Sequence, residues 1–263
     1  MRAVILAAGE GTRLRPHTLD RPKCLVELGG VSLLAIQLGV LRSAGITAVH
    51  VVTGYRADQI EELGHSTFHN PEYAHSNMVA SLMCAAALLD GGDDVLIAYG
   101  DIVYEPRVLE ALCACGDRLA TTVDTRWLEL WTARDEDPLA DAETLRLDAS
   151  GSILELGGKP RSLSEIEGQY MGLVKVRADF APELVRVWES LDPEASYDGR
   201  DRANMYMTSF LQHLIDHGCP LQAVPVAGGW LEVDTTGDLA LYEGMLGDGS
   251  LSSFCHIERE EGL

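Results

Sequence analysis

The sequence has no apolar stretch long enough to cross a membrane, and basic residues are scarce. Across 263 residues, 20 lysines and arginines stand against 41 aspartates and glutamates, which gives a net charge of −21. A surface this acidic repels polyanions, so nucleic acid and anionic membranes are not expected partners. The N-terminus lacks the basic region, apolar core and cleavage site of an export signal, and we therefore expect a cytoplasmic protein.

The sequence also lacks the cysteine and histidine spacings of a zinc site. Its six cysteines are scattered without a CxxC pair, and none of its eight histidines lies in an HExxH pattern. Free thiols in a reducing compartment are the expectation from this pattern.

Short apolar segments alternate with helical ones through the first 124 residues. Four segments are apolar and rich in β-branched residues, and they predict buried strands: Arg2–Ala8, Ala48–Gly54, Asp94–Asp101 and Arg118–Asp124. Helical spacing predicts helices between them, among them Ser32–Gly45 and Ser76–Gly92. This alternation predicts an α/β fold with a Rossmann-like, mostly parallel mixed sheet that is flanked by helices.

The pattern changes after Asp124, where strands and helices no longer alternate regularly. Residues Thr144–Lys159 predict two strands joined by a turn at DASG, and Gly168–Val176 predicts a further strand. We expect the first two to form a small β extension and the rest of this half to return to the same sheet.

The stretch LAAGEGTRLRPHTLDRPKCLVELGG, residues Leu6–Gly30, concentrates the scarce positive charge. Four basic residues lie within eleven positions that hold a single acid: Arg13, Arg15, Arg21, Lys23 and Asp20. Gly9 and Gly11 allow backbone N–H groups to approach an anion, and Arg13 adds a planar fork that suits phosphate oxygens. The stretch matches neither the GxGxxG dinucleotide pattern nor the GK[ST] of a Walker A loop, so another small anion is the expected ligand.

This stretch resembles the signature of the nucleotidylyltransferases that activate sugar phosphates and small phosphorylated head groups. The resemblance continues in YGD at Asp101, in GGK at Lys159 and in WLEVDTTGDL at Asp234. It implies a single nucleotidyltransferase domain over residues 1–263, with a nucleotide-binding half at 1–124 and an acceptor-binding half at 125–263. It also implies in-line attack of an acceptor phosphate on the α-phosphorus of a nucleoside triphosphate, with pyrophosphate leaving.

The resemblance assigns a role to each matching residue. Arg13, Lys23 and Lys159 are implied to be catalytic, with Lys23 at the α-phosphate and Lys159 at the acceptor phosphate. Asp101 and Asp234 are implied to bind Mg²⁺, a cation that combines few carboxylates with substrate oxygens. The other implied nucleotide contacts are Leu6, Ala7, Ala8, Gly9, Gly11, Thr12, Asn77, Ser81 and Gly100. The other implied acceptor contacts are Trp131, Gln169, Tyr170, Met171, Gly172 and Glu232, and the segment Arg126–Leu145 is expected to line or flank their pocket.

Several of these residues also have a structural interpretation. Arg15 is expected to be a solvated loop charge, and Lys159 has a turn residue as its alternative. Asn77 has a helix cap as its alternative, whereas Asp234 is a poorer cap than the threonines that follow it. Lys23 is expected to be an exposed loop lysine with little effect on folding stability.

We expect the strands before Asp101 and Asp234 to run parallel in one sheet, so that their carboxyl ends bring the two carboxylates together. Such a like-charged pair is expected to repel in the metal-free protein, so replacing either aspartate with asparagine is expected to leave stability unchanged or slightly higher.

The nucleotide is predicted from the region NPEYAHSNMVASLMCA, residues Asn70–Ala85. The region lacks the glutamine-proline and GLA pattern of sugar-1-phosphate thymidylyl- and uridylyltransferases, and it is similar to the N…Y…N…SL pattern of choline-phosphate cytidylyltransferases. DPLADAETL, GQYMGLVKV and NMYMTSFLQHLI look like the capsular phosphoglutamine cytidylyltransferases, with phosphonate cytidylyltransferases as a looser relation. This resemblance implies CTP and a small phosphorylated or phosphonate acceptor.

Two other functions stay open from the sequence alone. The first is a sugar-1-phosphate nucleotidylyltransferase that uses UTP, dTTP or GTP, and the second is a non-catalytic regulatory module of the same fold. Retention of Arg13, Lys23, Asp101 and Asp234 together argues against the second. A monomer and a homodimer are both compatible with the sequence.

Overall fold

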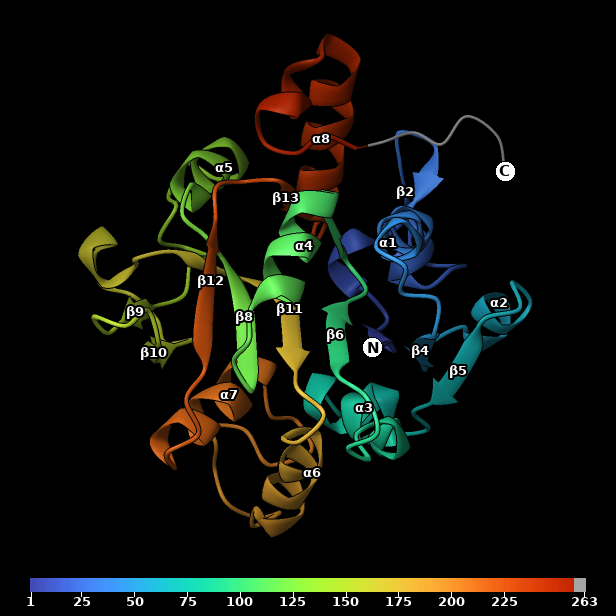
Figure 1. The fold of residues 1–263 in the computed structure, drawn as a ribbon. Helices are drawn as coiled ribbons and strands as arrows, with labels where there is room; N and C mark the ends of the chain where they lie inside the picture. The colour runs from blue at the N-terminus through green and yellow to red at the C-terminus, as the bar shows by residue number, and fades with distance from the viewer. Residues whose placement is uncertain (258–263) are drawn as a thin grey trace.

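A seven-stranded sheet lies at the centre of the molecule, in a computed structural model that describes residues 1–257 (Figure 1). In spatial order its strands are β12 (Gln222–Val226), β8 (Leu119–Asp124), β11 (Gln169–Val176), β6 (Val95–Tyr99), β1 (Arg2–Ala7), β4 (Val49–Thr53) and β5 (Ser66–His69). Among these described strands, β11 alone runs antiparallel to its neighbours. The predicted α/β class with a mostly parallel mixed sheet is therefore confirmed.

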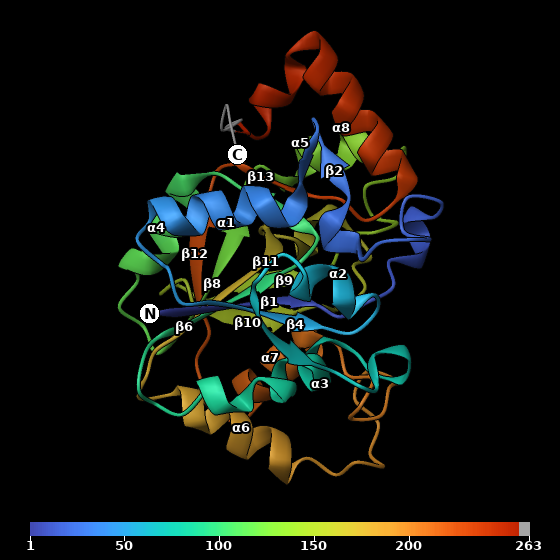
Figure 2. The same ribbon diagram turned by 90° about the vertical axis from the view of Figure 1, so that its right-hand side faces the viewer.

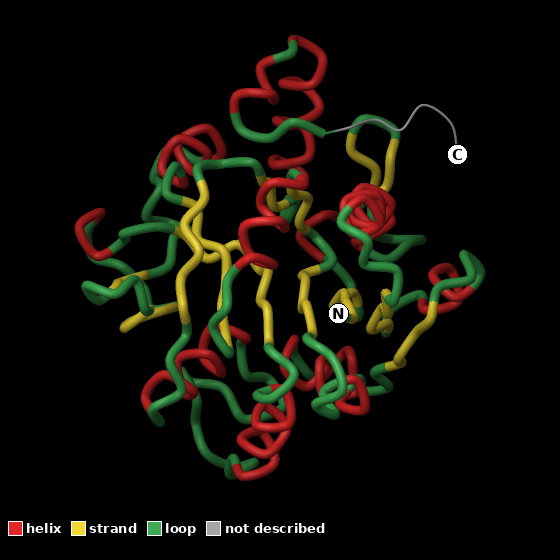
Figure 3. The backbone as a smooth tube through the Cα atoms, in the orientation of Figure 1, coloured by secondary structure: helices red, strands yellow, loops and turns green. Residues whose placement is uncertain are grey.

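Helices cover both faces of this sheet, as Figure 2 shows. The helices α1 (Leu33–Ser43) and α4 (Pro106–Ala114) lie on one face, and α3 (Met78–Cys84), α6 (Ala181–Ser190) and α7 (Met207–Asp216) lie on the other. The strands gather between the two sets of helices (Figure 3). No helix in residues 1–257 is long and apolar enough to span a membrane.

The apolar run of β1 explains the two helical layers. Successive side chains of a strand point to opposite faces, so an uninterrupted apolar run requires cover on both sides. Ala3 and Ile5 pack into the core beneath α1 and α4, whereas Val4 and Leu6 pack into the core beneath α3 and α7. The helix expected over Ser76–Gly92 is shorter than predicted, because α3 ends at Cys84 and a 3₁₀ turn over Ala86–Leu88 follows it.

The chain after residue 124 adds two strands, β11 and β12, to the sheet and several elements at its edges. The antiparallel hairpin of β9 (Leu145–Leu147) and β10 (Ile153–Leu156) forms the expected small extension. The helix α5 (Trp127–Arg134) lies beside α8 (Thr236–Asp248). Three further short elements are α2 (Ala57–Glu61), β2 (Glu27–Leu28) and β3 (Val31–Ser32).

Two short strands outside the central sheet bring Asp101 and Asp234 together. β13 (Trp230–Glu232) pairs antiparallel with β7 (Ile102–Tyr104), with Ile102 opposite Glu232. Asp101 directly precedes β7, Asp234 follows β13, and the backbone N–H of Val233 donates to the carbonyl oxygen of Asp101 at 2.9 Å. The expectation of parallel strands in one sheet is wrong here. An antiparallel pair gives the same proximity because the start of one strand lies beside the end of the other.

Candidate active site

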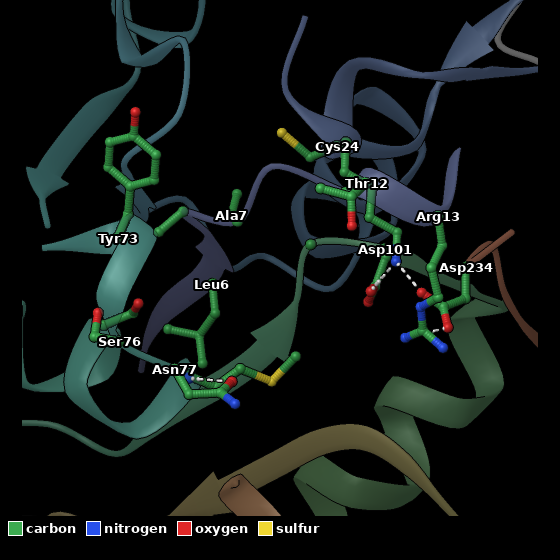
Figure 4. Close-up of a pocket in the computed structure, with 17 residues that line it drawn as sticks. Leu6, Ala7, Thr12, Arg13, Cys24, Tyr73, Ser76, Asn77, Asp101 and Asp234 are labelled. Atoms are coloured by element: carbon green, nitrogen blue, oxygen red, sulfur yellow. Dashed lines mark hydrogen bonds and ion pairs between the residues drawn. The ribbon is translucent and has the colours of Figure 1, made fainter. Parts of the chain in front are cut away.

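A cavity of about 280 Å³ lies between the glycine-rich loop after β1 and the helix α3. Figure 4 shows Arg13, Asp101 and Asp234 at one end of this cavity and Tyr73 and Asn77 at the other. All the predicted nucleotide contacts line it, together with the two predicted metal ligands and two of the predicted catalytic residues: Leu6, Ala7, Ala8, Gly9, Gly11, Thr12, Arg13, Lys23, Asn77, Ser81, Gly100, Asp101 and Asp234. The structure thus brings these dispersed residues into one place, which we call the nucleotide cavity.

Two glycines give the nucleotide cavity its shape. Gly11 has a φ of +61°, and a Cβ atom on it would lie 2.9 Å from the Cβ of Lys23. The hydroxyl of Thr18 donates to the carbonyl oxygen of Gly11 at 2.8 Å and holds the loop in this conformation. A Cβ on Gly100 would lie 2.8 Å from the carbonyl oxygen of Leu6, so this glycine allows the end of β6, and with it Asp101, to approach the loop.

The charged end of the nucleotide cavity is a network of four side chains. The Nζ atom of Lys23 donates to Oδ2 of Asp101 at 2.6 Å and to Oδ1 of Asp234 at 2.7 Å. Nη2 of Arg13 lies 2.5 Å from Oδ2 of Asp234. Burial lowers the pKa of Lys23, but the carboxylates of Asp101 and Asp234 outweigh it, so the pKa lies above its ordinary value. The side chain of Lys23 is only 14% exposed, and the expectation of an exposed lysine is therefore wrong.

The two aspartates fit the role of ligands for a divalent cation. Both already share one cationic group, the ammonium of Lys23, and Oδ1 of Asp101 is buried without a hydrogen-bond partner among the described residues. No cluster of three or more acidic, histidine or cysteine side chains in residues 1–257 has the arrangement of a metal site. The chain offers two carboxylates, which suits a cation that takes its other ligands from phosphate oxygens and water.

Hydrogen bonds and ion pairs show the structural roles of several of these residues. Oδ1 of Asn77 accepts from the backbone N–H of Met78 at 2.8 Å, so Asn77 caps α3 while it also lines the cavity. Thr235, as expected, caps α8 in place of Asp234. Arg15 pairs with Glu10 at 2.9 Å and lines neither this cavity nor the next, in agreement with a surface charge.

A second cavity, of about 370 Å³, adjoins the first, and we call it the acceptor cavity. The two share four lining residues: Arg13, Asn77, Met78 and Asp234. Six predicted acceptor contacts line the second: Trp131, Gln169, Tyr170, Met171, Gly172 and Glu232. The two cavities are therefore contiguous beside the Asp234 carboxylate.

Lys159 is the predicted site residue that the structure does not bring to these cavities. It is exposed, lines neither of them, and donates from Nζ to the carbonyl oxygens of Leu139 and Ala140, both at 2.6 Å. These bonds hold the segment that leads into Asp141. The contact of Lys159 with an acceptor phosphate stays a prediction.

Acidic side chains in the acceptor cavity were missed by the sequence analysis. Asp141 and Glu143 lie inside the segment that was expected to flank this pocket, but neither was singled out. The side-chain oxygen of Gln169 accepts from the backbone N–H of Glu143 at 3.2 Å, and its side-chain nitrogen donates to the carbonyl oxygen of Glu143 at 2.6 Å. These two bonds fix the backbone at Glu143. Burial, with a smaller contribution from Asp141, raises the pKa of Glu143 to about 7.

A buried arginine beside the acceptor cavity was also missed. The side chain of Arg134 is 6% exposed; its Nε binds Asp238 at 2.9 Å, and its Nη atoms lie 3.6 Å from Asp141 and 3.8 Å from Glu232. Burial and the Asp101 carboxylate raise the pKa of Glu232 to about 8. The other missed lining residues of the two cavities are Cys24, Tyr73, Ser76, Met78, Tyr99, Tyr206, Met207, Thr208 and Trp230.

Comparisons with solved structures agree with this fold. The chain superposes with a TM-score of 0.70 on the CTP:phosphocholine cytidylyltransferase of Streptococcus pneumoniae, at 20% identity over 93% of this chain and 98% of the other. It superposes with a TM-score of 0.71 on the inositol-1-phosphate CTP transferase of T. maritima, at 18% identity over 97% of both chains. At such identities the likeness concerns the fold.

Sequence comparisons identify relatives of the chain and the family to which it belongs. The chain is 40% identical over 249 residues to the CTP:phosphoglutamine cytidylyltransferase of Campylobacter jejuni, which covers 91% of this chain and 98% of the relative. It is 33% identical over 163 residues to the CMP-5'-(3-aminopropyl)phosphonate synthase of Streptomyces rubellomurinus, over 59% of this chain and 24% of the relative. The family model of the MobA-like NTP transferase domain matches residues 3–164, a range that holds the glycine-rich loop and Asp101. With loop, fold and relatives in agreement, the chain belongs to the MobA-like NTP transferase family and is a nucleotidyltransferase.

Proposed function

We propose that the protein transfers CMP from CTP to a small phosphorylated or phosphonate acceptor and releases pyrophosphate. The observation that carries this proposal is the shared wall of the two cavities, where Arg13 and Asp234 face both. An α-phosphate bound from one side and an acceptor phosphate bound from the other would meet there, which is the arrangement that in-line transfer requires. The relative at 40% identity is named for CTP and the relative at 33% identity for a CMP-linked product, and both names favour CTP as the nucleotide.

The residues of the nucleotide cavity would bind and neutralise the triphosphate. Backbone N–H groups at Gly9 and Gly11 and the exposed guanidinium of Arg13 would hold the outer phosphates. The ammonium of Lys23 would offset the negative charge that develops at the α-phosphate. We propose Mg²⁺ as the family's divalent cation here; held by Asp101 and Asp234, it would supply charge neutralisation. The acceptor phosphate is already ionised at neutral pH, so no general base is required.

We further propose that the acceptor carries an ammonium group. Asp141, Glu143 and Glu232 line the acceptor cavity together with Asp234, whereas Arg13 is the basic residue of its lining. A phosphate alone would be repelled by this lining, but an ammonium on the same molecule would be attracted to it. The indole rings of Trp131 and Trp230, with centroids 6.1 Å apart, add aromatic faces that favour a cation.

A matrix of pyrophosphate-release assays tests both parts of this proposal. Each nucleotide, CTP, UTP, dTTP and GTP, is supplied with Mg²⁺ and with phosphocholine, 2-aminoethylphosphonate, a phosphorylated amino-acid amide or glucose-1-phosphate. We expect release with CTP and a cationic acceptor to be at least tenfold faster than with any other combination. Preferred release with UTP or dTTP and glucose-1-phosphate would overturn the proposal in favour of a sugar-1-phosphate nucleotidylyltransferase.

The remaining predictions concern the surroundings of the enzyme. We infer that the reaction takes place in the cytoplasm, where nucleoside triphosphates are made, and that the acidic surface excludes nucleic acid as a partner. A homodimer is a prediction that multi-angle light scattering of the purified protein would test.

A further inference from the structure

A buried asparagine lies behind the uncharged end of the nucleotide cavity. Asn70 directly follows β5, is 3% exposed, and is not among the residues that line the cavity. Its Nδ2 atom donates to Oγ of Ser76 at 3.0 Å and to Oγ of Ser81 at 2.9 Å. Its Oδ1 atom accepts from the backbone N–H of Glu72 at 2.9 Å. Asn70 thus connects two serines that do line the cavity.

The bond to Glu72 fixes which way the Asn70 amide points. A backbone N–H can only donate, so the atom that faces Glu72 must be the oxygen of the amide. The amide nitrogen then faces Ser76 and Ser81, and both of its hydrogens are used on their hydroxyl oxygens. Each serine must accept from Asn70, and each is left with a hydroxyl proton to donate elsewhere.

The two serine hydroxyls differ in whether their proton has an acceptor within the protein. The hydroxyl of Ser76 donates to the carbonyl oxygen of Glu72 at 2.8 Å. The hydroxyl of Ser81 has no such acceptor among the described residues, although Ser81 is only 6% exposed and lines the cavity. The free proton of Ser81 is therefore available to a ligand in the cavity. A buried hydroxyl that donates to nothing is costly, so a ligand acceptor at this point gains free energy.

The location of Ser81 indicates which part of the nucleotide it would meet. Lys23, Asp101 and Asp234 occupy the charged end, where the phosphates would bind. Tyr73 and Asn77 lie at the opposite end (Figure 4), and Ser81 is one helical turn after Asn77 on α3. A nucleotide with its phosphates at the charged end would place its base against this turn of α3.

We propose that Asn70 is a positioning residue for base selection, because it forces Ser81 to act as a hydrogen-bond donor toward the pyrimidine edge of the nucleotide. This inference rests on the proposed use of CTP. N3 of cytosine is an acceptor and pairs with such a donor. N3 of uracil and thymine carries a hydrogen, so the same serine would face it donor to donor. Unmatched donors in a buried contact reject the wrong ligand more strongly than a matched contact selects the right one.

The substitution Asn70→Asp reverses the polarity of this contact with little change of shape. An aspartate at this position still accepts from Glu72, but its second oxygen accepts from the serines instead of donating to them. The proton of Ser81 then turns toward the carboxylate, and a lone pair of Ser81 faces the cavity. We expect the ratio of kcat/KM for CTP to that for UTP to fall at least tenfold, which corresponds to about 1.4 kcal/mol.

Two serine variants form a matched pair that does not depend on the Asn70 variant. Ser81→Ala removes the proposed donor, and we expect it to lower the CTP-to-UTP ratio at least fivefold. Ser76→Ala removes the other hydroxyl that Asn70 contacts. Because the Ser76 hydroxyl already donates to the carbonyl oxygen of Glu72, we expect this substitution to change kcat/KM for CTP and for UTP by the same factor. Circular dichroism and thermal melting establish that each variant is folded.

The outcomes separate this inference from the proposed function. A wild-type enzyme without preference for CTP would overturn the proposed function. A wild-type enzyme that prefers CTP, together with an unchanged ratio in Ser81→Ala, would overturn the role of Asn70 and Ser81 alone. An equal fall of the ratio in Ser76→Ala and Ser81→Ala would do the same, because it would point to a general disturbance of α3. If Asn70→Asp does not fold, the serine pair decides the question.

Discussion

The nucleotide cavity and the acceptor cavity share a wall but balance their charges in different ways. In the first, Lys23 and Arg13 pair with the carboxylates of Asp101 and Asp234 at distances of 2.5 to 2.7 Å. In the second, no ion pair within residues 1–257 joins Glu143 to a basic side chain, and the indole N–H of the buried Trp131 has no hydrogen-bond partner there. The carboxylates at the charged end of the nucleotide cavity are thus paired with basic side chains of the same cavity, whereas Glu143 of the acceptor cavity has no such partner in the described part of the chain.

The largest expected effect on activity comes from removing the negative charge of one carboxylate in the nucleotide cavity. Asp101→Asn and Asp234→Asn should each lower kcat/KM about 10³-fold, or about 4 kcal/mol, because each removes a metal ligand and a partner of Lys23. The structure also reverses one expectation from the sequence: since Lys23 bridges the pair, each variant should lower the melting temperature of the metal-free protein. Titration of Mg²⁺ against CTP-induced stabilisation provides the measurement, and an unchanged Mg²⁺ dependence would exclude the substituted aspartate as a ligand.

Lys23→Met tests the same balance from the cationic side. We expect kcat/KM to fall about 10²-fold, or about 2.7 kcal/mol, through the lost stabilisation of the α-phosphate. Because the ammonium is mostly buried between two carboxylates, its loss should also destabilise the free protein by about 2 kcal/mol. Denaturant unfolding at low Mg²⁺ measures the second effect. Unchanged stability would show that the bridge between Asp101 and Asp234 contributes nothing to the fold.

The sequence predicted the residues of the nucleotide cavity but not the burial of Lys23 among them. The residues of the nucleotide cavity come largely from one continuous loop, whose glycines and basic residues are unusual in an acidic chain, and they were identified together. The burial of Lys23 depends on the antiparallel pairing of β7 and β13, for which short strands give no sequence signal. The inner strands β1, β4 and β6 were predicted because they are apolar runs, whereas the polar edge strand β5 was not.

The acceptor cavity was predicted less completely because its lining is scattered along the chain. Asp141 and Glu143 lie in an acidic segment, and such segments are usually solvated surface. Their inward position depends on backbone contacts with Gln169 and Lys159, which a linear pattern does not show. The same contacts give Lys159 a place that its GGK motif did not indicate.

A substitution in the acceptor cavity should affect the acceptor alone. For Glu143→Gln, we expect the KM for an ammonium-bearing acceptor to rise about tenfold, since a charged hydrogen bond of about 1.4 kcal/mol is lost. The KM for CTP should stay unchanged. The matched control is 2-hydroxyethylphosphonate, which lacks the ammonium of 2-aminoethylphosphonate and should be insensitive to the substitution. Equal losses with both phosphonates would argue against recognition of a cation by Glu143.

The smallest expected effect is a pH dependence of stability in the ligand-free protein. Because burial raises the pKa of Glu143 to about 7 from 4.5, the folded state binds more protons than the unfolded state between these values. Stability is therefore lost as the pH rises from about 4.5 to 7. Asp141, Tyr99 and Tyr170 are the titratable groups that interact with Glu143, and both tyrosines stay protonated in this range because burial raises the pKa of each.

Glu143→Gln removes this titration, and the variant should melt at a higher temperature than the wild type at pH 8 but not at pH 4.5. The expected gain is about 1 to 3 kcal/mol, from the shift of the pKa and 1.36 kcal/mol per pH unit. Equal melting temperatures at pH 8 would mean that the carboxylate is solvated in the free protein.

The central claim is that the two cavities hold the two substrates of one transfer, with CTP on one side and a cationic phosphorylated acceptor on the other. Phosphorus-31 NMR of the enzyme with CTP, Mg²⁺ and 2-aminoethylphosphonate observes that transfer directly. We expect the loss of the three CTP signals, free pyrophosphate, and a new pair of coupled signals from a phosphonate linked to CMP. Release of pyrophosphate without that coupled pair, or formation of the pair with UTP and 2-hydroxyethylphosphonate at an equal rate, would contradict it.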